Sequence, residues 1–301
     1  MALRTSRAYA PAEVVIDRSR CNNCGICTKV CNMTLSMRAG ELIVDQSRLW
    51  GCIGCGQCVA ACPEDAIRVE GRDFHTADSF PIPSREERAD FQSLLKLFQA
   101  RRSIRRFRPR EVPPEVIGQI IDAASTAPMG VPPSDVSVLV FRTREKVEQF
   151  AADLLDSMRR MRWMFTMPGL LLMRPLIGKE GYESFEEFVG PLVDTYLEEH
   201  ERGVDMLFYD APLALYFYGS AYADPADPII AATYGMLAAE SLGLGSCMIG
   251  LPGPCMKNDP RLRTKYKVPK NCQPGLAIVF GYPDVKFRHA VRRRFAEVRE
   301  C

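Results

Sequence analysis

Eight of the twelve cysteines in this 301-residue chain fall into two short runs with the same internal spacing. The first run spans residues 21–31, the second spans residues 52–62, and both follow the pattern C-x₂-C-x₂-C-x₃-C. This spacing is typical of bacterial segments that hold [4Fe–4S] clusters. Pro63 follows the second run, as the pattern expects, whereas Asn32 follows the first. Two adjacent runs predict an electron-transfer segment with two clusters.

The fourth cysteine of each run is expected to serve the other cluster. In proteins with two such clusters the fourth ligand crosses over in this way. Three glycines lie within the runs, where a tight loop requires backbone angles that glycine adopts readily; they are Gly25, Gly54 and Gly56. The predicted ligands are Cys21, Cys24, Cys27 and Cys62 for one cluster, and Cys52, Cys55, Cys58 and Cys31 for the other.

Other uses of clustered cysteines fit this pattern less well. A structural zinc site takes four ligands in two pairs, usually with a long gap between the pairs. Here the ligands come in fours, twice. A disulfide framework is typical of small secreted chains, and the first residues lack the apolar segment of a signal peptide. The spacing therefore favours iron–sulfur clusters.

Composition places the chain among ordinary globular proteins. It is 47% hydrophobic and 25% charged, with a formal net charge of +2. This balance argues against a general nucleic-acid binder, and no run approaches the roughly 18 apolar residues that a membrane span requires. We expect a soluble cytoplasmic protein with no membrane or nucleic-acid partner. The length accommodates one large domain and one small one.

The hydrophobic pattern predicts two domains joined by an aperiodic stretch. Residues 1–80 are expected to form a two-[4Fe–4S] ferredoxin-like domain with its linker, and residues 90–301 a larger domain. The linker over 71–88 contains Pro81 and Pro83. The stretch over 159–210 has no clear period, and no complete glycine fingerprint of a dinucleotide-binding fold occurs. Strands are predicted near 13–16, 42–44, 66–69, 136–141, 213–218 and 275–282, and helices near 91–98, 114–126, 147–158 and 228–242.

A cluster of arginines opens the larger domain. Six arginines occur between Arg101 and Arg110. Such a stretch is consistent with a solvated basic surface or a nucleic-acid patch. It is equally consistent with a phosphate cradle, because guanidinium groups bind phosphate oxygens in bidentate fashion. Composition alone does not choose between these interpretations.

The order of several short motifs along the chain favours the phosphate cradle. They are Arg-Arg-Ser-Ile-Arg-Arg-Phe at 101–107, Ala-Ser-Thr-Ala-Pro at 124–128, Tyr-Asp-Ala-Pro at 209–212, Ala-Ala-Glu-Ser-Leu-Gly-Leu-Gly-Ser-Cys at 238–247, Phe-Gly-Tyr-Pro at 280–283 and an arginine-rich tail at 292–295. With these pieces in this order, residues 90–301 resemble the nitroreductase family of FMN enzymes. The cysteine runs add a resemblance to its iron–sulfur subgroup.

This resemblance implies an α+β fold, with a mixed sheet flanked by helices, in an intertwined homodimer that binds FMN at the subunit interface. One departure is the segment 131–135, which lacks the Asn and Gln that many members carry after Ala-Pro; Ser134 is the candidate to replace one. The residues implied at FMN are Arg101, Arg102, Ser103, Arg105 and Arg293 for the phosphate and ribityl chain, Pro128, Met129 and Gly130 from the partner subunit, and Met248, Ile249 and Gly250 beside the ring.

The resemblance and the cysteine runs together predict an FMN- and iron–sulfur-dependent reductase. We expect a low-potential donor protein such as ferredoxin, and a small aromatic or conjugated electrophile as substrate, reduced in a nitro, ene or related reaction. Two alternatives stay open: a flavin-dependent dehydrogenase that exports electrons through the clusters, and an electron-relay or redox subunit for a partner protein. No catalytic side chain is assigned; Tyr182, Tyr196 and Tyr209 are possible proton donors.

Two further features of the larger domain are interpreted as packing. Cys247 lies next to the implied flavin edge, and we expect it to be a small buried residue. Methionines at 158, 161, 164, 167 and 173, with Trp163 and Phe165, favour core or dimer packing. The same region could also cover a substrate pocket.

Overall fold

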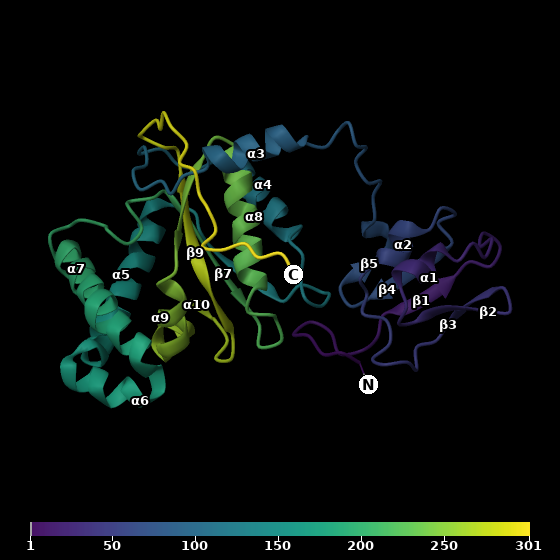
Figure 1. Cartoon of the computed structure of the whole chain (residues 1–301), viewed down its shortest axis with the longest axis horizontal. Coiled ribbons are helices and arrows are strands. Elements are labelled where there is room, and N and C mark those ends of the chain that lie inside the picture. The colour runs from purple at the N-terminus through teal and green to yellow at the C-terminus, as the bar shows by residue number, and fades with distance from the viewer. Residues whose placement is uncertain (1) are drawn as a thin grey trace. The chain divides into compact units, whose positions relative to one another are not determined.

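The structure, a computed structural model, describes residues 2–301, with the backbone alone at Phe165 (Figure 1). The chain divides into two compact units. The first comprises Met1–Arg88, Pro128–Ser137 and Gly219–Asp227, and the second comprises Ala89–Ala127, Val138–Tyr218 and Pro228–Cys301. Across residues 2–301, no helix combines the length and apolar character of a membrane span.

The first unit is built from short strands and two very short helices. Strand β4 (Ile67–Gly71) pairs in antiparallel fashion with β1 (Glu13–Ile16) on one side and with β5 (Phe74–His75) on the other. A separate hairpin joins β2 (Leu35–Arg38) to β3 (Glu41–Val44). The predicted strands at 13–16, 42–44 and 66–69 are confirmed as β1, β3 and β4. The remaining elements are α1 (Ile26–Val30), α2 (Gln57–Ala61) and a 3-10 turn, η1 (Thr76–Asp78).

Glycine decides where the two short helices begin. Gly25 precedes α1 with φ of 71°, and Gly56 precedes α2 with φ of 69°. Gly54 also lies in the left-handed region, with φ of 70°. The predicted need for glycine in both cysteine loops is therefore confirmed, because side chains rarely adopt these angles. At Gly56 a Cβ would also collide with the ring of Phe74, 2.7 Å from its nearest atom.

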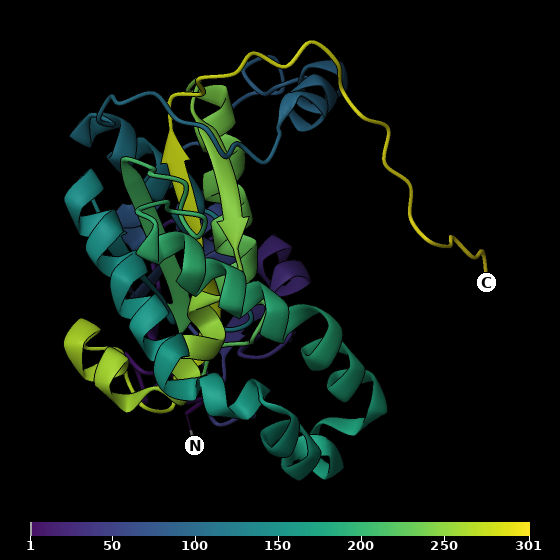
Figure 2. The same cartoon turned by 90° about the vertical axis from the view of Figure 1, so that its left-hand side faces the viewer.

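A four-stranded sheet forms the centre of the larger fold, in the order β6-β7-β9-β8. Helices cover both of its faces (Figures 1 and 2). The predicted strands at 136–141, 213–218 and 275–282 and all four predicted helices are confirmed. The strands are β6 (Val136–Phe141), β7 (Leu213–Gly219), β8 (Gly245–Ile249) and β9 (Gln273–Gly281), and the helices are α3 (Phe91–Ala100), α4 (Pro114–Ser125), α5 (Arg144–Met161), α8 (Asp227–Ser241), α9 (Pro252–Asn258) and α10 (Pro260–Tyr266).

Strand β7 is apolar along its whole length. Ala214, Tyr216 and Tyr218 point toward the cluster of buried residues that includes α5. Phe217, on the opposite face, lies next to Gly235 of α8. Both faces of the strand are covered, so all seven of its residues are buried. A strand buried on both faces carries a continuous apolar run rather than an alternating one.

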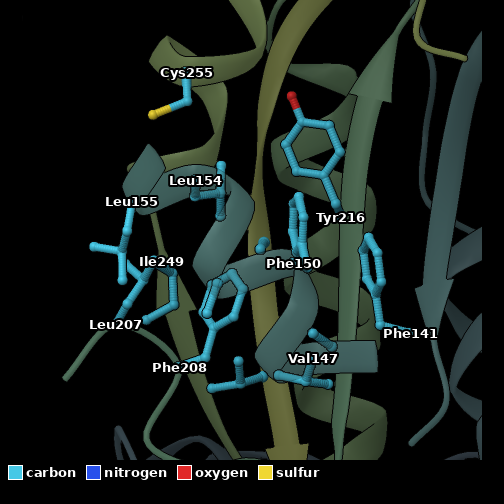
Figure 3. Packing of buried hydrophobic residues seen from close by; sticks show 14 of the residues in the cluster. Phe141, Val147, Phe150, Leu154, Leu155, Leu207, Phe208, Tyr216, Ile249 and Cys255 are labelled. Atoms are coloured by element: carbon cyan, nitrogen blue, oxygen red, sulfur yellow. The ribbon is translucent and has the colours of Figure 1, made fainter. Parts of the chain in front are cut away.

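The main core lies between α5 and this sheet (Figure 3). The ring of Phe150 stacks on Phe141 with centroids 4.2 Å apart and an interplanar angle of 9°. It also meets Phe208 at 5.4 Å and the edge of Tyr266 at 5.0 Å. Offset and edge contacts of this kind are the favourable arrangements for aromatic rings. They fix α5 against the strands that carry the candidate site.

The stretch over 159–210, which the sequence left unassigned, is helical as far as Glu201 apart from a break at Thr166, and residues 202–210 form turns. It contains η2 (Arg162–Phe165), α6 (Met167–Ser184), a π-helical turn η3 (Phe185–Val189) and α7 (Gly190–Glu201). Helix α6 is interrupted at Gly178, where φ is 71°. Leu171, Leu172 and Leu176 of this helix are exposed. Because apolar residues occur on all sides of this helix, the sequence shows no 3.6-residue period there, and the helix could not be predicted from the hydrophobic pattern.

Strand β9 approaches β7 so closely that only glycine fits at one point. A Cβ at Gly275 would lie 1.9 Å from the carbonyl oxygen of Phe217. We expect Gly275→Ala to lower the free energy of unfolding of the second unit by about 1–3 kcal/mol, because the strands must move apart. Gly118 in α4 is the matched control, since a Cβ there meets nothing within 4 Å.

At this helical control position, Gly118→Ala should raise stability by about 0.5–1 kcal/mol. Denaturant unfolding followed by far-UV circular dichroism compares the two variants with the parent. An unchanged midpoint for Gly275→Ala would contradict the contact described.

Candidate functional site

The eight cysteines of the two runs gather into two groups of four in the first unit. The first group, Cys21, Cys24, Cys27 and Cys62, lines one small cavity. In the second group, burial raises the pKa of the Cys58 thiol to about 12, and neighbouring charge at Cys31, Cys52 and Cys55 adds to the rise. Each group therefore contains three cysteines of one run and the last cysteine of the other. This is the grouping that crossed ligation requires; ligation itself stays a prediction.

The surroundings of these thiols fit iron–sulfur clusters. The backbone N–H of Gly54 donates to the sulfur of Cys52 at 3.4 Å, and that of Ala66 donates to the sulfur of Cys62 at 3.3 Å. Hydrogen bonds to sulfur stabilise the negative charge of a ligated cluster and influence its potential. Within residues 2–301, no three His, Cys, Asp or Glu side chains are arranged to hold a single metal ion. A cube does not require such convergence, because each thiolate binds a different iron.

The arginine motif of the second unit is fixed to the sheet by one apolar side chain. The N–H of Ile104 donates to the carbonyl of Ser246 at 2.9 Å, and Ser103 forms a parallel bridge with Ser246. Ile104 is buried against Gly245, where a Cβ would lie 2.4 Å from its Cγ1. Ser103 and Arg105 flank this inward-pointing residue. The contact holds the motif alongside β8.

Three of the predicted phosphate ligands lie together. Arg101, Arg102 and Arg293 line one groove, to which Phe98 and Ala290 also contribute. Within residues 2–301, none of the three arginines forms an ion pair with a carboxylate. The C-terminal segment that carries Arg293 has neither helix nor strand (Figure 2). The groove offers unpaired guanidinium groups, which suit a phosphate or a similar dianion.

A second hollow lies at the end of β8. Its volume is about 460 Å³, and Arg105 lines it together with Met248, Ile249 and Gly250. This volume is within the usual range for small-molecule sites. Much of the wall is apolar and comes from α5, η2, η3 and α7; it includes Met158, Met161, Met164, Phe188, Leu192 and Val193. Three of the five methionines noted in the sequence thus line a cavity. The side chain of Phe165 lies outside the described residues.

The polar part of this cavity includes Arg105, Asn258, two tyrosines and a cysteine. Tyr196, Tyr209 and Cys247 all line it, whereas the hydroxyl of Tyr182 contacts Glu186 at 3.3 Å, away from the cavity lining. Burial raises the pKa of Tyr196, so its hydroxyl stays protonated at neutral pH. Sequence alone could not choose among the three tyrosines, because the choice depends on how α6 and α7 fold.

Tyr209 is held in an unusual backbone conformation. Its φ is 59°, and that of Asp210 is 53°. The carboxylate of Asp205 accepts hydrogen bonds from the N–H groups of Phe208 at 2.8 Å and Asp210 at 3.0 Å, which fixes the turn. The guanidinium carbon of Arg105 lies 5.8 Å from the centre of the Tyr209 ring. Left-handed residues of this type are concentrated at functional sites.

Cys247 is buried, with 3% of its surface exposed, as the sequence predicted. Burial raises the pKa of its thiol, while the charge of Arg105 opposes that rise. Ser103 and Arg101 also act on this thiol. The cysteine therefore lies among residues of the arginine motif and is protonated at neutral pH.

The predicted flavin residues between positions 128 and 134 lie in the first unit. The N–H of Gly130 donates to the carboxylate of Asp227 at 3.2 Å. The hydroxyl of Ser134 accepts from the N–H of Val136 at 3.3 Å, and its carbonyl accepts from Arg7 at 2.5 Å. The contact expected of Pro128, Met129 and Gly130 with cofactor in a partner subunit stays a prediction, as does the role of Ser134.

Two family models match the chain. Residues 98–282 match the nitroreductase family, and residues 13–63 match a 4Fe-4S dicluster domain. A protein of Methanothermobacter thermautotrophicus, named "Putative NADH dehydrogenase/NAD(P)H nitroreductase", is 26% identical over 196 residues, which is 63% of this chain and 77% of that protein.

Two solved structures are similar to this chain. The nitroreductase of Bacteroides fragilis with bound FMN has a TM-score of 0.51 and 19% identity, over 69% of this chain and 98% of its own. A nitroreductase of Desulfitobacterium hafniense with bound FMN has a TM-score of 0.48 and 21% identity, over 68% of this chain and 97% of its own. The first of these likenesses supports the α+β fold expected from the sequence.

The crossed grouping of thiols leads to a specific prediction for variants in which single cysteines of the two runs are replaced. We expect Cys62→Ser to alter the same cluster signal as Cys24→Ser, although the two residues belong to different runs. Cys31→Ser should alter the same signal as Cys55→Ser. Electron paramagnetic resonance of the reduced protein distinguishes the two signals, and Cys272→Ser, outside both runs, is the control. Pairing of Cys31→Ser with Cys24→Ser instead would overturn the crossed arrangement.

Proposed function

The chain belongs to the nitroreductase family, and from this membership we propose that it is a reductase that uses FMN and two [4Fe–4S] clusters to reduce a small aromatic or conjugated electrophile. The family and the dicluster domain identify an oxidoreductase with an iron–sulfur segment. The observation that carries the finer proposal is the gathering of eight thiols into two groups of four in the first unit. A low-potential donor protein such as ferredoxin would supply the electrons.

The first unit would hold the clusters. Its two thiol groups provide four ligands each, and backbone N–H groups at Gly54 and Ala66 already point at ligand sulfurs. Cys24 and Cys55 are the exposed members of the two groups. A bound cluster supplies one-electron transfer, and an exposed edge permits exchange with a protein donor.

The second unit would hold FMN. Arg101, Arg102 and Arg293 suit its phosphate, because three unpaired guanidinium groups line one groove. Arg105 and the backbone of Met248–Gly250 suit the ring, since both line the cavity at the end of β8. Bound FMN accepts electrons singly or in pairs and delivers a hydride equivalent to an electrophile. The chain's own contribution is to bind, orient and exclude water.

The cavity itself supports a small-molecule substrate rather than electron relay to a protein. Its wall is largely apolar, which suits a flat aromatic or conjugated molecule. Tyr196 and Tyr209 add hydroxyl groups, and because burial raises the pKa of Tyr196, its hydroxyl is neutral and can donate a hydrogen bond. Either hydroxyl could donate a hydrogen bond or a proton to a reduced substrate.

The assignment of the groove of three arginines to the phosphate of FMN can be tested by measuring FMN affinity. We expect Arg102→Ala and Arg293→Ala each to raise the Kd for FMN roughly 10- to 150-fold, since a charge-assisted hydrogen bond contributes about 1.5–3 kcal/mol. Riboflavin has no phosphate, so its affinity should not change in either variant. Arg142→Ala, an exposed position outside the groove, is the control. Fluorescence titration measures all four proteins, and equal losses for FMN and riboflavin would contradict the assignment.

The electron donor is tested by anaerobic spectroscopy of the reconstituted protein. A reduced ferredoxin should bleach the flavin band of the parent but not of a Cys24→Ser/Cys55→Ser double variant, in which both clusters are impaired. Dithionite should bleach both proteins. Rapid bleaching of the parent by NADH or NADPH would instead make the flavin the entry point and favour electron export through the clusters.

A further inference from the structure

Arg72 of the first unit is buried and binds four separate carbonyl groups. It is 6% exposed and has φ of 56° in the turn between β4 and β5. Its Nε donates to the carbonyl of Ile53 at 3.1 Å, and Nη2 donates to that of Pro132 at 2.9 Å. Nη1 donates to the carbonyls of Leu3 at 2.8 Å and Ala10 at 3.2 Å. Carbonyl oxygens satisfy the donors but leave the positive charge of the guanidinium group in place.

This charge lies beside one of the two thiol groups. Ile53, which accepts from Arg72, directly follows Cys52, and a Cβ at Gly54 would lie 3.1 Å from the Cβ of Arg72. Burial raises the pKa of the Cys52 thiol, and the guanidinium group opposes that rise. The cation is thus near a ligand of the group formed by Cys31, Cys52, Cys55 and Cys58.

Among the described residues, the other thiol group has no buried cation of this kind beside it. Arg20, next to Cys21, is exposed, and it pairs with Asp65 at 3.5 Å. Arg18 donates to the carbonyl of Leu42 at 2.8 Å but is also exposed. Exposed cations are screened by water, and a carboxylate partner cancels most of the remaining field. The two groups therefore differ in the charge that a bound cluster would experience.

Arg72 also connects its thiol group to the segment 128–137. Arg72 binds the carbonyl of Pro132 in this segment. Two other hydrogen bonds hold the segment: Arg7 donates to the carbonyl of Ser134 at 2.5 Å, and the N–H of Ser6 donates to Asp135 at 2.9 Å. Throughout the described chain, no hydrogen bond or ion pair joins residues 128–137 to residues 18–31 or 62–66. Of the two thiol groups, the one beside Arg72 is thus linked to the segment whose first residues, 128–130, are predicted to lie along the flavin of a partner subunit.

We infer that Arg72 sets the order of the two clusters. Adding an electron makes a cluster more negative, and a buried positive charge nearby stabilises that reduced state. The cluster bound by Cys31, Cys52, Cys55 and Cys58 therefore has the higher potential and is the second to receive each electron. The cluster at Cys21, Cys24, Cys27 and Cys62 is oxidised as the second is reduced. This inference rests on the proposed function, since it requires two clusters and a flavin downstream.

The test is a potentiometric titration of the full chain with both clusters, followed by electron paramagnetic resonance. We expect Arg72→Met to lower the higher of the two potentials and to leave the other unchanged. A roughly tenfold change in the ratio of oxidised to reduced cluster at fixed potential is the expected size, which corresponds to ~59 mV for one electron. A Cys55→Ser variant identifies which signal belongs to the cluster beside Arg72.

The matched control is Arg68→Met. Arg68 lies on β4, four positions from Arg72, and is exposed. It should shift neither potential, because water screens its charge. Unchanged potentials in Arg72→Met, or an equal shift in Arg68→Met, would overturn the inference.

Two further variants separate charge from structure. Asp135 is buried, accepts from Ser6 and Ser220, and its charge acts on Arg72. Asp135→Asn should raise the same potential, because a negative charge is removed, whereas Arg72→Met lowers it. Shifts in one direction for both variants would indicate loosened structure and contradict the electrostatic role. Arg72→Lys, which retains the charge, should keep the parental potential even if Arg72→Met does not fold.

This measurement requires neither flavin nor substrate. A chain that binds fewer than two clusters would contradict the proposed function and, with it, the inference. If the chain binds two clusters and neither potential changes in Arg72→Met, the inference is contradicted but the proposed function is not.

Discussion

The gathering of cysteines from both runs at each thiol group is the constraint on which the first unit depends. Cys62 joins the first run and Cys31 joins the second, so each group ties the two halves of the segment together. The apolar core of the cysteine segment is small, and two of its buried members, Cys27 and Cys58, are themselves predicted ligands. Metal binding in such a segment contributes directly to folding. The backbone between the ligands must turn sharply, which explains the left-handed glycines.

A comparable constraint positions the site of the second unit. Ile104 is the buried residue in an otherwise basic motif, and it fits because Gly245 has no side chain. Its backbone bond to Ser246 fixes the motif to β8. The same strand ends at Met248 and Ile249, which border the cavity. The contact of Ile104 with Gly245 thereby holds the arginine motif next to β8, and the aromatic core around Phe150 packs on the same sheet.

Electrostatics distinguishes the parts of the molecule. The groove around Arg101 and Arg102 presents unpaired cations to solvent, which suits an anionic ligand. The cavity at the end of β8 is largely apolar, with a single arginine and two tyrosines. In the first unit, Arg72 is a buried cation bound by carbonyls alone. Each of these cations has a different degree of burial, and burial decides whether a charge binds a ligand or changes the energy of a neighbouring group.

The sequence by itself determined the features that depend on local spacing. The two cysteine runs, the glycine turns, six of the strands and the amphipathic helices α4 and α5 all follow from residues close together in the chain, whereas β2, β5 and β8 were not predicted. The family followed from short motifs in order. Tertiary structure decided the rest: the helices over 162–201, the fact that Tyr196 and Tyr209 but not Tyr182 line the cavity, the cavity itself, and the position of Arg72. These depend on contacts between residues far apart in sequence, and neither periodicity nor motif spacing records which distant residues will meet.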